Sequence, residues 1–281
     1  MGSEMCIRDS GNSVAFNVII SIITELSFFL VFYIISRRTQ TDWVQASGVR
    51  NVSPWYLYII AAILGILCVF LFNPIISLWE QLLSLIGYDI SGELPMPLDS
   101  VGMLILAIFA VALIPAICEE FLYRGLVLNG LRKYGVWVSV LTSALLFSLM
   151  HMNLQQLPYT FILGVIFGLI VYYTRNIWLS IIMHFLNNAT AILIMYFATN
   201  SSTEFVWWHI LVALGCVIVA CGIIWLVVWL IKKKDNKATE QDPLDTQTIL
   251  PAAQRNKLML TPILAGVLFL ILFSLINFGV I

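Results

Sequence analysis

The chain has 281 residues, of which 61% are hydrophobic and only 10% are charged. Soluble domains usually contain about 25% charged residues. The composition therefore excludes an ordinary soluble protein and predicts a multi-pass protein of the cell membrane, in contact with the lipid bilayer. The net charge of −1 leaves no basic surface for nucleic acid, so we expect no nucleic-acid partner.

Long apolar runs predict an all-α fold, a polytopic transmembrane helical bundle of about eight spans. The reason is that a helix needs about 20 apolar residues to cross a bilayer. Residues 1–13 are polar and unlike the rest, so we set this leader aside as non-native. The predicted spans are Val14–Ser36, Trp55–Trp79, Val101 to the region of Glu119, Val136–Met152, Pro158–Thr174, Ile177–Ala198, Val206–Ile231 and Leu258–Ile281.

The predicted membrane domain covers residues 14–231. The polar stretch 232–257 is expected to be a cytoplasmic linker to a last transmembrane helix at 258–281. Loops without Lys or Arg alternate with basic loops near Arg37, Arg132, Arg175 and Lys233. The positive-inside rule therefore predicts that the basic loops face the cytoplasm.

The third apolar run is unusual because apolar residues resume after Arg124. One long helix is therefore predicted from about Met103 to Lys133, with Glu119 near its middle. Pro115 lies one turn before Glu119 and has no backbone N–H. It is predicted to kink the helix and to free backbone carbonyls toward the site.

Glu119, Glu120 and Arg124 place charged groups within this apolar run, where lipid makes them costly. Arg124 follows Glu120 by four residues, the spacing of an ion pair within a helix. Glu119 points about 100° away from Glu120. The pattern gives Glu120 a supporting role with Arg124 and leaves Glu119 for the reaction, because a carboxylate in an apolar pocket suits a general base. A structural charge cluster at a helix end explains the same motif equally well.

Two further motifs carry histidine at helical spacing, Phe147 with His151 and His184 with Asn188. Each motif alone is weak evidence for a functional site, because a single histidine beside an apolar stripe is usually a buried structural residue. Glutamate combined with two histidines predicts the activation of water, and hence hydrolysis.

The depth of these groups can be predicted from the helix rise of about 1.5 Å per residue. Counted from the cytoplasmic end of each predicted helix, Glu119 lies roughly 21 Å deep, His151 roughly 22 Å and His184 roughly 10 Å. All three fall inside the hydrocarbon region and are expected to converge in a cavity open to the cytoplasm. The shallower position of His184 disagrees with that convergence.

The ordered set EExxxR, FxxxH and HxxxN on successive helices resembles the CPBP family. This family contains the CAAX prenyl protease and bacteriocin-processing proteins, also called Abi-type intramembrane proteases. The similar region, a predicted catalytic core, runs from about Val101 to Ala198, and all three motifs match without a substitution. The resemblance implies an all-helical intramembrane endopeptidase that cuts a peptide or protein substrate in or at the membrane. It also implies roles such as the trimming of prenylated CAAX tails, bacteriocin maturation, self-immunity or surface-protein processing.

Carried over residue by residue, the resemblance implies that Glu119 activates the attacking water. His151 and His184 would bind or orient that water, and Asn188 would help to stabilise the oxyanion. The supporting residues would be Glu120, Arg124 and Phe147.

The resemblance leaves the cofactor open, because the family is described both as metal-dependent and as glutamic. Glu119, His151 and His184 are enough ligands for a catalytic zinc ion. The spacing is not HExxH, however, and the same groups can work without metal. The glutamic interpretation is slightly favoured.

Two other functions fit parts of the same sequence. Intramembrane carboxylates and histidines also form proton relays in transporters, and Glu25 in the middle of the first span supports that alternative. No inverted repeat of the kind found in common carriers is evident. The third alternative is a non-catalytic scaffold or immunity protein with the same fold.

Overall fold

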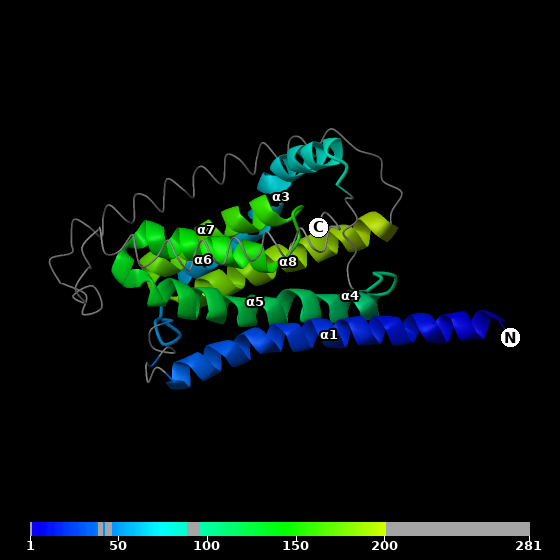
Figure 1. Ribbon diagram of the computed structural model, residues 1–281, viewed down its shortest axis with the longest axis horizontal. Helices are drawn as coiled ribbons and strands as arrows, with labels where there is room; N and C mark the ends of the chain where they lie inside the picture. Colours follow the sequence, from blue (N-terminus) through cyan, green and yellow to red (C-terminus); the bar gives the residue numbers. More distant parts are fainter. Residues whose placement is uncertain (1, 39–41, 43–46, 89–95, 201–281) are drawn as a thin grey trace.

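The computed structural model describes residues 2–38, 42, 47–88 and 96–200 (Figure 1). Every regular element in these ranges is helical, and no strand occurs among them, so the predicted all-α fold is confirmed. The spans predicted at 206–231 and 258–281, and the linker at 232–257, lie outside the described residues. The count of eight spans therefore stays a prediction.

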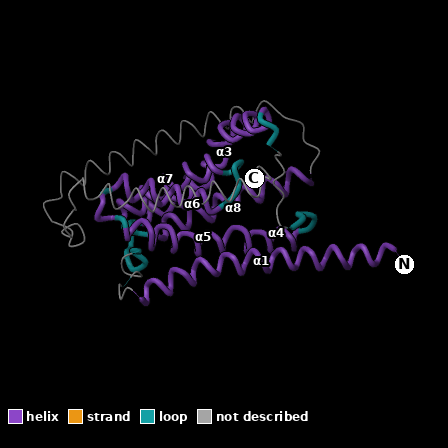
Figure 2. The backbone as a smooth tube through the Cα atoms, in the orientation of Figure 1, coloured by secondary structure: helices purple, strands orange, loops and turns teal. Residues whose placement is uncertain are grey.

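Seven α-helices and three π-helical or 3₁₀ turns are the regular elements of the described part. Figure 2 shows them joined by short loops. The α-helices are α1 (Gly2–Arg38), α3 (Trp55–Leu85), α4 (Val101–Ala107), α5 (Ile114–Glu120), α6 (Val136–Met150), α7 (Leu157–Thr174) and α8 (Ile177–Asn200). The turns are the π-helical η1 (Ile108–Leu113) and η2 (Phe121–Leu128) and the 3₁₀ turn η3 (Arg132–Tyr134).

Five helical stretches of the described residues are long and apolar enough to cross a membrane. They are Val14–Arg38, Trp55–Leu85, Val101–Leu128, Leu157–Thr174 and Ile177–Phe197. The fourth predicted span, Val136–Met152, contains a helix that is two residues shorter than predicted. Its helix, α6, has 15 residues, fewer than the roughly 20 that a bilayer requires.

The third predicted helix is one continuous helical run in which α4, η1, α5 and η2 follow one another without a break. It begins where the side chain of Ser100 accepts a hydrogen bond from the backbone N–H of Met103. It ends before η3, and Gly135, with a φ of 94°, turns the chain toward α6. π-Helical turns are rare and often mark functional sites. Here they lie on both sides of the short helix that carries Glu119 and Glu120.

Helix α8 occupies the centre of the described bundle and packs against α3, α5, α7 and η1 (Figure 1). Gly65 allows α3 to come close, because a Cβ atom there would lie 2.5 Å from the carbonyl oxygen of Met183. Gly164 does the same between α7 and α6, where an added Cβ would lie 2.9 Å from the Cα of Ala144. Small residues of this kind let transmembrane helices pack closely.

Helix α1 lies at the edge of the described bundle, alongside α4 and α5 (Figure 1). The rings of Phe29 and Phe32 contact Phe121 of η2, with centroid distances of 5.6 Å and 5.2 Å. Many large apolar side chains of α1 are exposed, and such a surface suits contact with lipid. They include Phe16, Ile19, Ile23, Leu26 and Leu30.

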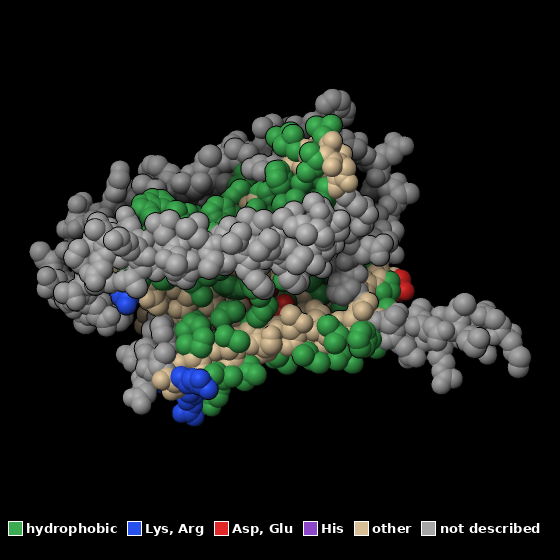
Figure 3. Space-filling view, in the orientation of Figure 1, with side chains coloured by type: hydrophobic (Ala, Val, Ile, Leu, Met, Phe, Trp, Pro, Cys, Tyr) green, Lys and Arg blue, Asp and Glu red, His purple; other side chains and the backbone are tan. Residues whose placement is uncertain are grey.

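The described parts of the basic loops meet at one end of the bundle. The guanidinium of Arg132 donates to the carbonyl of Tyr172 and stacks over its ring at 4.0 Å. Asn51, in the loop before α3, donates to the carbonyl of Arg175 at 2.6 Å. In Figure 3 the visible Lys and Arg side chains accordingly lie at the left end of the molecule.

This clustering leads to a labelling prediction for the orientation in the membrane. Arg50 and Asp99 are both exposed and lie in successive loops, one on each side of α3. In a chain whose five native cysteines are replaced, we expect an impermeant thiol reagent added to intact cells to label Asp99→Cys but not Arg50→Cys. After permeabilisation both should react. Labelling of Arg50→Cys in intact cells would refute the orientation. The basic loop near Lys233 lies outside the described residues.

Candidate active site

Glu120 and Arg124 form the ion pair that their spacing predicts. Nη1 of Arg124 lies 2.6 Å from Oε1 of Glu120, and both side chains are fully buried. Nη2 of Arg124 donates to the carbonyl of Gly164 on α7 at 3.3 Å. The guanidinium also stacks over Phe147 of α6 at 4.5 Å and over Phe167 of α7 at 5.3 Å. Arg124 therefore ties the glutamate helix to two neighbouring helices.

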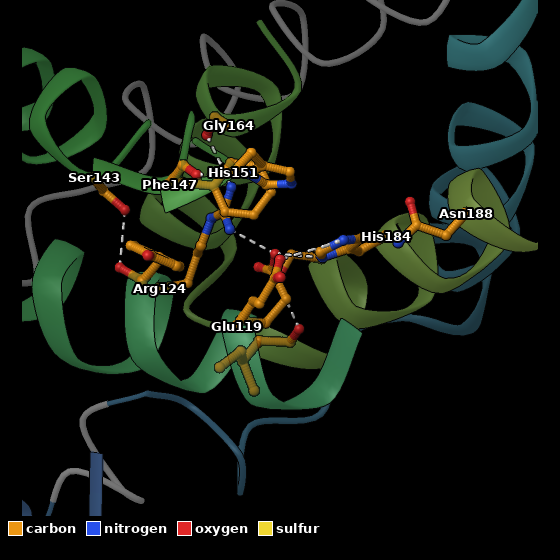
Figure 4. A network of polar contacts seen from close by, with 12 residues as sticks. Glu119, Arg124, Ser143, Phe147, His151, Gly164, His184 and Asn188 are labelled. Atoms are coloured by element: carbon orange, nitrogen blue, oxygen red, sulfur yellow. Dashed lines mark hydrogen bonds and ion pairs between the residues drawn. The ribbon is translucent and has the colours of Figure 1, made fainter. Parts of the chain in front are cut away.

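His184 of α8 contacts both glutamates, and Figure 4 shows its ring pointing toward Glu119. Its Nδ1 is 3.1 Å from Oε1 of Glu120, and its Nε2 is 3.7 Å from Oε2 of Glu119. The first contact is a hydrogen bond, whereas the second is too long to be one. Oε2 of Glu119 and Oε2 of Glu120 are both buried and have no hydrogen-bond partner in the described part of the chain. The two glutamates differ in their other features: Oε1 of Glu120 is engaged by Arg124 and His184, and its side chain is fully buried, whereas the Glu119 side chain is 11% exposed.

Phe147 connects His151 to this cluster. Its ring lies 5.0 Å from the ring of His151 and 5.6 Å from the ring of His184, both edge to face. Nδ1 of His151 lies 2.9 Å from the carbonyl of Phe147, one turn earlier in α6. Because a carbonyl only accepts, Nδ1 carries the proton, and Nε2 of His151 is the nitrogen left for another partner.

Asn188 lies one turn after His184 on α8, and its Nδ2 donates to the carbonyl of Val111 at 3.3 Å. Val111 precedes Pro115 by four residues, so in an α-helical register this carbonyl has no helical donor, because proline lacks the N–H. The turn that contains Val111 is π-helical, and there the N–H of Ile114 bonds to Phe109, five residues earlier. The bond from Asn188 agrees with the prediction that Pro115 kinks the helix and frees carbonyls toward the site, which stays a prediction.

The predicted difference in depth between His184 and Glu119 is measured from the membrane surface and stays a prediction. The start of α8 is covered by protein, because Asn176 and Ile177 are both fully buried. The amide of Asn176 donates to the hydroxyls of Ser53 and Tyr58 at 2.9 Å each. His184 contacts both glutamates, so this predicted difference does not keep the two motifs apart.

The arrangement does not fit a three-ligand zinc site. Among the described residues, no three His, Cys, Asp or Glu side chains are grouped as metal ligands. Nδ1 of His184 is engaged by Glu120, and the structure gives His151 no contact with Glu119. We derive no step through a metal, and the zinc expected from Glu119, His151 and His184 stays a prediction.

Sequence reasoning missed the contribution of α7, which carries none of the three motifs. Its Gly164 carbonyl and Phe167 ring both contact Arg124. One signal was available, because Gly164 and Gly168 form a GxxxG pattern that indicates close helix packing. The aromatic partner Phe167 has no comparable signal in one sequence.

Glu25 of α1 is a further carboxyl group beside the site. It interacts electrostatically with Glu119 and with Cys118. Its Oε2 is buried, without a hydrogen-bond partner in the described part of the chain. Helix α1 packs against α5, which explains how an isolated glutamate in the first span comes close to the Glu119 helix.

Comparison with known families gives one match. Residues 101–190 match the family described as type II CAAX prenyl endopeptidase Rce1-like. Neither a curated protein nor a solved structure matches the chain. The matched residues cover about a third of the chain and contain all three motifs together with every side chain of the cluster around His184. This segment is therefore similar to the Rce1-like group, which confirms the resemblance to the CPBP family of intramembrane proteases.

Proposed function

We propose that the protein hydrolyses peptide bonds within the membrane and that Glu119 is the general base that activates water. The difference between the two glutamates supports this assignment most directly. Oε1 of Glu120 is engaged by both Arg124 and His184. Oε2 of Glu119 lies 3.7 Å from Nε2 of His184, too far for a hydrogen bond, and the Glu119 side chain is 11% exposed, whereas that of Glu120 is fully buried.

In the proposed reaction, the Glu119 carboxylate takes one proton from a water molecule as the water oxygen attacks the scissile carbonyl carbon. The water has one further O–H, and Nε2 of either His184 or His151 accepts it, because both Nδ1 atoms are held by protein oxygens. The second N–H of the Asn188 amide stabilises the oxyanion that forms. Glu119 then passes its proton to the leaving amine nitrogen as the C–N bond breaks.

The family match favours a CAAX-type substrate, a peptide held at the membrane by a prenyl group. The test uses the full chain in liposomes with two peptides of one sequence, one farnesylated and one unmodified. We expect the farnesylated peptide to be cut at a single bond, identified by mass, and the unmodified peptide to be cut more slowly. Two intact peptides would argue for a scaffold. Bacteriocin maturation and surface-protein processing would use the same chemistry, and testing them requires peptides from those substrates.

A proton-coupled carrier is the second candidate, favoured by one observation. Glu25 interacts electrostatically with Glu119, and Glu119 lies beside His184, so the three titratable side chains form a row. A pH-sensitive dye enclosed in the same liposomes distinguishes the two functions. A carrier would move protons without cutting a peptide, and the protease would cut without moving them.

The two histidines are expected to act as a unit. His151→Ala and His184→Ala should each lower kcat by roughly 10²–10⁴-fold, the usual contribution of acid–base groups. The double variant should lose little more than either single one, because groups that act together are strongly non-additive. Peptide cleavage by the three variants measures this directly. Losses that multiply would show that the histidines do not share one water.

A further inference from the structure

The carbonyl of Val111 is an unusual group inside this bundle. In an α-helical register it would accept the N–H of residue 115, but residue 115 is proline and has none. Val111 lies at the point where the π-helical turn, with Ile114 bonded to Phe109, gives way to the α-helix α5. Pro115 is buried, and Val111 is partly buried. An unpaired carbonyl in such a place is costly, so a donor from another segment is required.

The donor is Asn188, whose Nδ2 lies 3.3 Å from the oxygen of Val111. Helix α8 packs directly against η1, the π-helical turn that contains Val111 and ends shortly before Pro115. The neighbouring Asn187 bonds to two other helices, α3 and α7. Its amide donates to the carbonyl of Gly65 at 3.4 Å and accepts from the hydroxyl of Tyr159 at 2.7 Å. The two adjacent asparagines therefore connect α8 to different elements: Asn187 to α3 and α7, and Asn188 to η1.

The bond from Asn188 also bears on His184, because the two residues are one turn apart on the same face of α8. An amide nitrogen carries two hydrogens, so the bond to Val111 uses one and leaves the other for a further acceptor. Figure 4 shows Asn188 beside His184 on α8, on the side of the cluster away from Arg124.

We propose that Pro115 is a positioning residue. By withholding one N–H, it leaves the Val111 carbonyl as a fixed acceptor that holds the Asn188 amide, with its second hydrogen directed into the site. This inference rests on the proposed function only in the part that assigns Asn188 to the oxyanion. The link between Pro115 and Asn188 is a separate structural claim.

The test is a double-mutant cycle of Pro115→Ala, Asn188→Ala and the double variant, in the full chain. Pro115→Ala restores the missing N–H, which can bond to Val111 and displace Asn188. Asn188→Ala should lower the melting temperature in the wild-type background and leave it nearly unchanged in the Pro115→Ala background.

Pro158→Ala is the matched control. Pro158 lies in the first turn of α7, where an N–H is not needed, so its effect should add to that of Asn188→Ala. If the melting-temperature shifts of Pro115→Ala and Asn188→Ala simply add in the double variant, the link between Pro115 and Asn188 is overturned.

Peptide cleavage tests the positioning role. Asn188→Ala should lower kcat by roughly 10²–10³-fold, the usual loss for an oxyanion donor. Pro115→Ala should lower kcat by at least about tenfold with KM nearly unchanged, and the double variant should equal Asn188→Ala. An unchanged kcat in Pro115→Ala would overturn the role. If no peptide is cut by the wild type, the proposed function fails, and the melting cycle still decides the link.

A second variant covers the case in which Pro115→Ala does not fold. Asn188→Asp keeps the shape of the side chain but, as a carboxylate, cannot donate to the Val111 carbonyl. We expect it to lower both the melting temperature and kcat. An Asn188→Asp variant that melts and turns over like the wild type would contradict the proposal.

Discussion

Replacing Arg124 with methionine is expected to lower the free energy of unfolding by about 3–5 kcal/mol, because it leaves a buried carboxylate without its cation. Arg124 is fully buried and bonds to Glu120 and to the carbonyl of Gly164. Methionine retains much of the apolar stem that packs against Phe147 and Phe167. Reversible unfolding in mixed micelles measures the loss.

Two controls isolate the ion pair. Arg38→Met removes an exposed arginine at the end of α1 and should change stability by less than about 0.5 kcal/mol. Combining Arg124→Met with Glu120→Gln should recover part of the loss, because no unpaired charge then remains. A cost below about 1 kcal/mol for Arg124→Met alone would mean that the pair does not hold the helices together.

Glu119→Gln is expected to abolish measurable turnover, with a loss of roughly 10²–10⁴-fold or more, because an amide cannot accept the proton of water. Its stability should stay near that of the wild type, since Oε2 of Glu119 has no hydrogen bond to lose. Peptide cleavage and thermal melting of the same preparation measure both quantities.

Glu120→Gln is the matched variant, one residue further along the helix. It weakens the bonds to Arg124 and His184, so both the melting temperature and the activity should fall. The contrast between a stable, inactive Glu119→Gln and an unstable Glu120→Gln separates the reacting carboxylate from the supporting one. If Glu119→Gln keeps most of the wild-type rate, the assignment of the base is wrong.

Local spacing predicted much of this cluster because the relevant contacts lie within one helix. The four-residue step from Glu120 to Arg124 gives their ion pair. The absent N–H of Pro115 predicted freed carbonyls, and Asn188 donates to the carbonyl of Val111, four residues before this proline. The long apolar run around Glu119 predicted one continuous helix, which the structure contains.

Contacts between helices were less predictable, because they depend on where each helix begins and on which faces meet. Counting residues from the predicted start of its helix placed His184 apart from Glu119, yet the structure brings it into contact with both glutamates. The two glutamates point about 100° apart on their helix. The sequence does not show that one imidazole would sit between them, with a nitrogen facing each. Phe167 reaches Arg124 from a helix without any polar motif.

Hydrolysis in water enriched in ¹⁸O tests the central claim most directly. The full chain is reconstituted in liposomes with the farnesylated peptide, and the products are weighed by mass spectrometry. If Glu119 activates water for direct attack on the peptide bond, the new carboxyl terminus of the product gains one ¹⁸O atom, and Glu119→Gln yields no labelled product. An intact peptide, or equal labelled product from Glu119→Gln, would contradict the account.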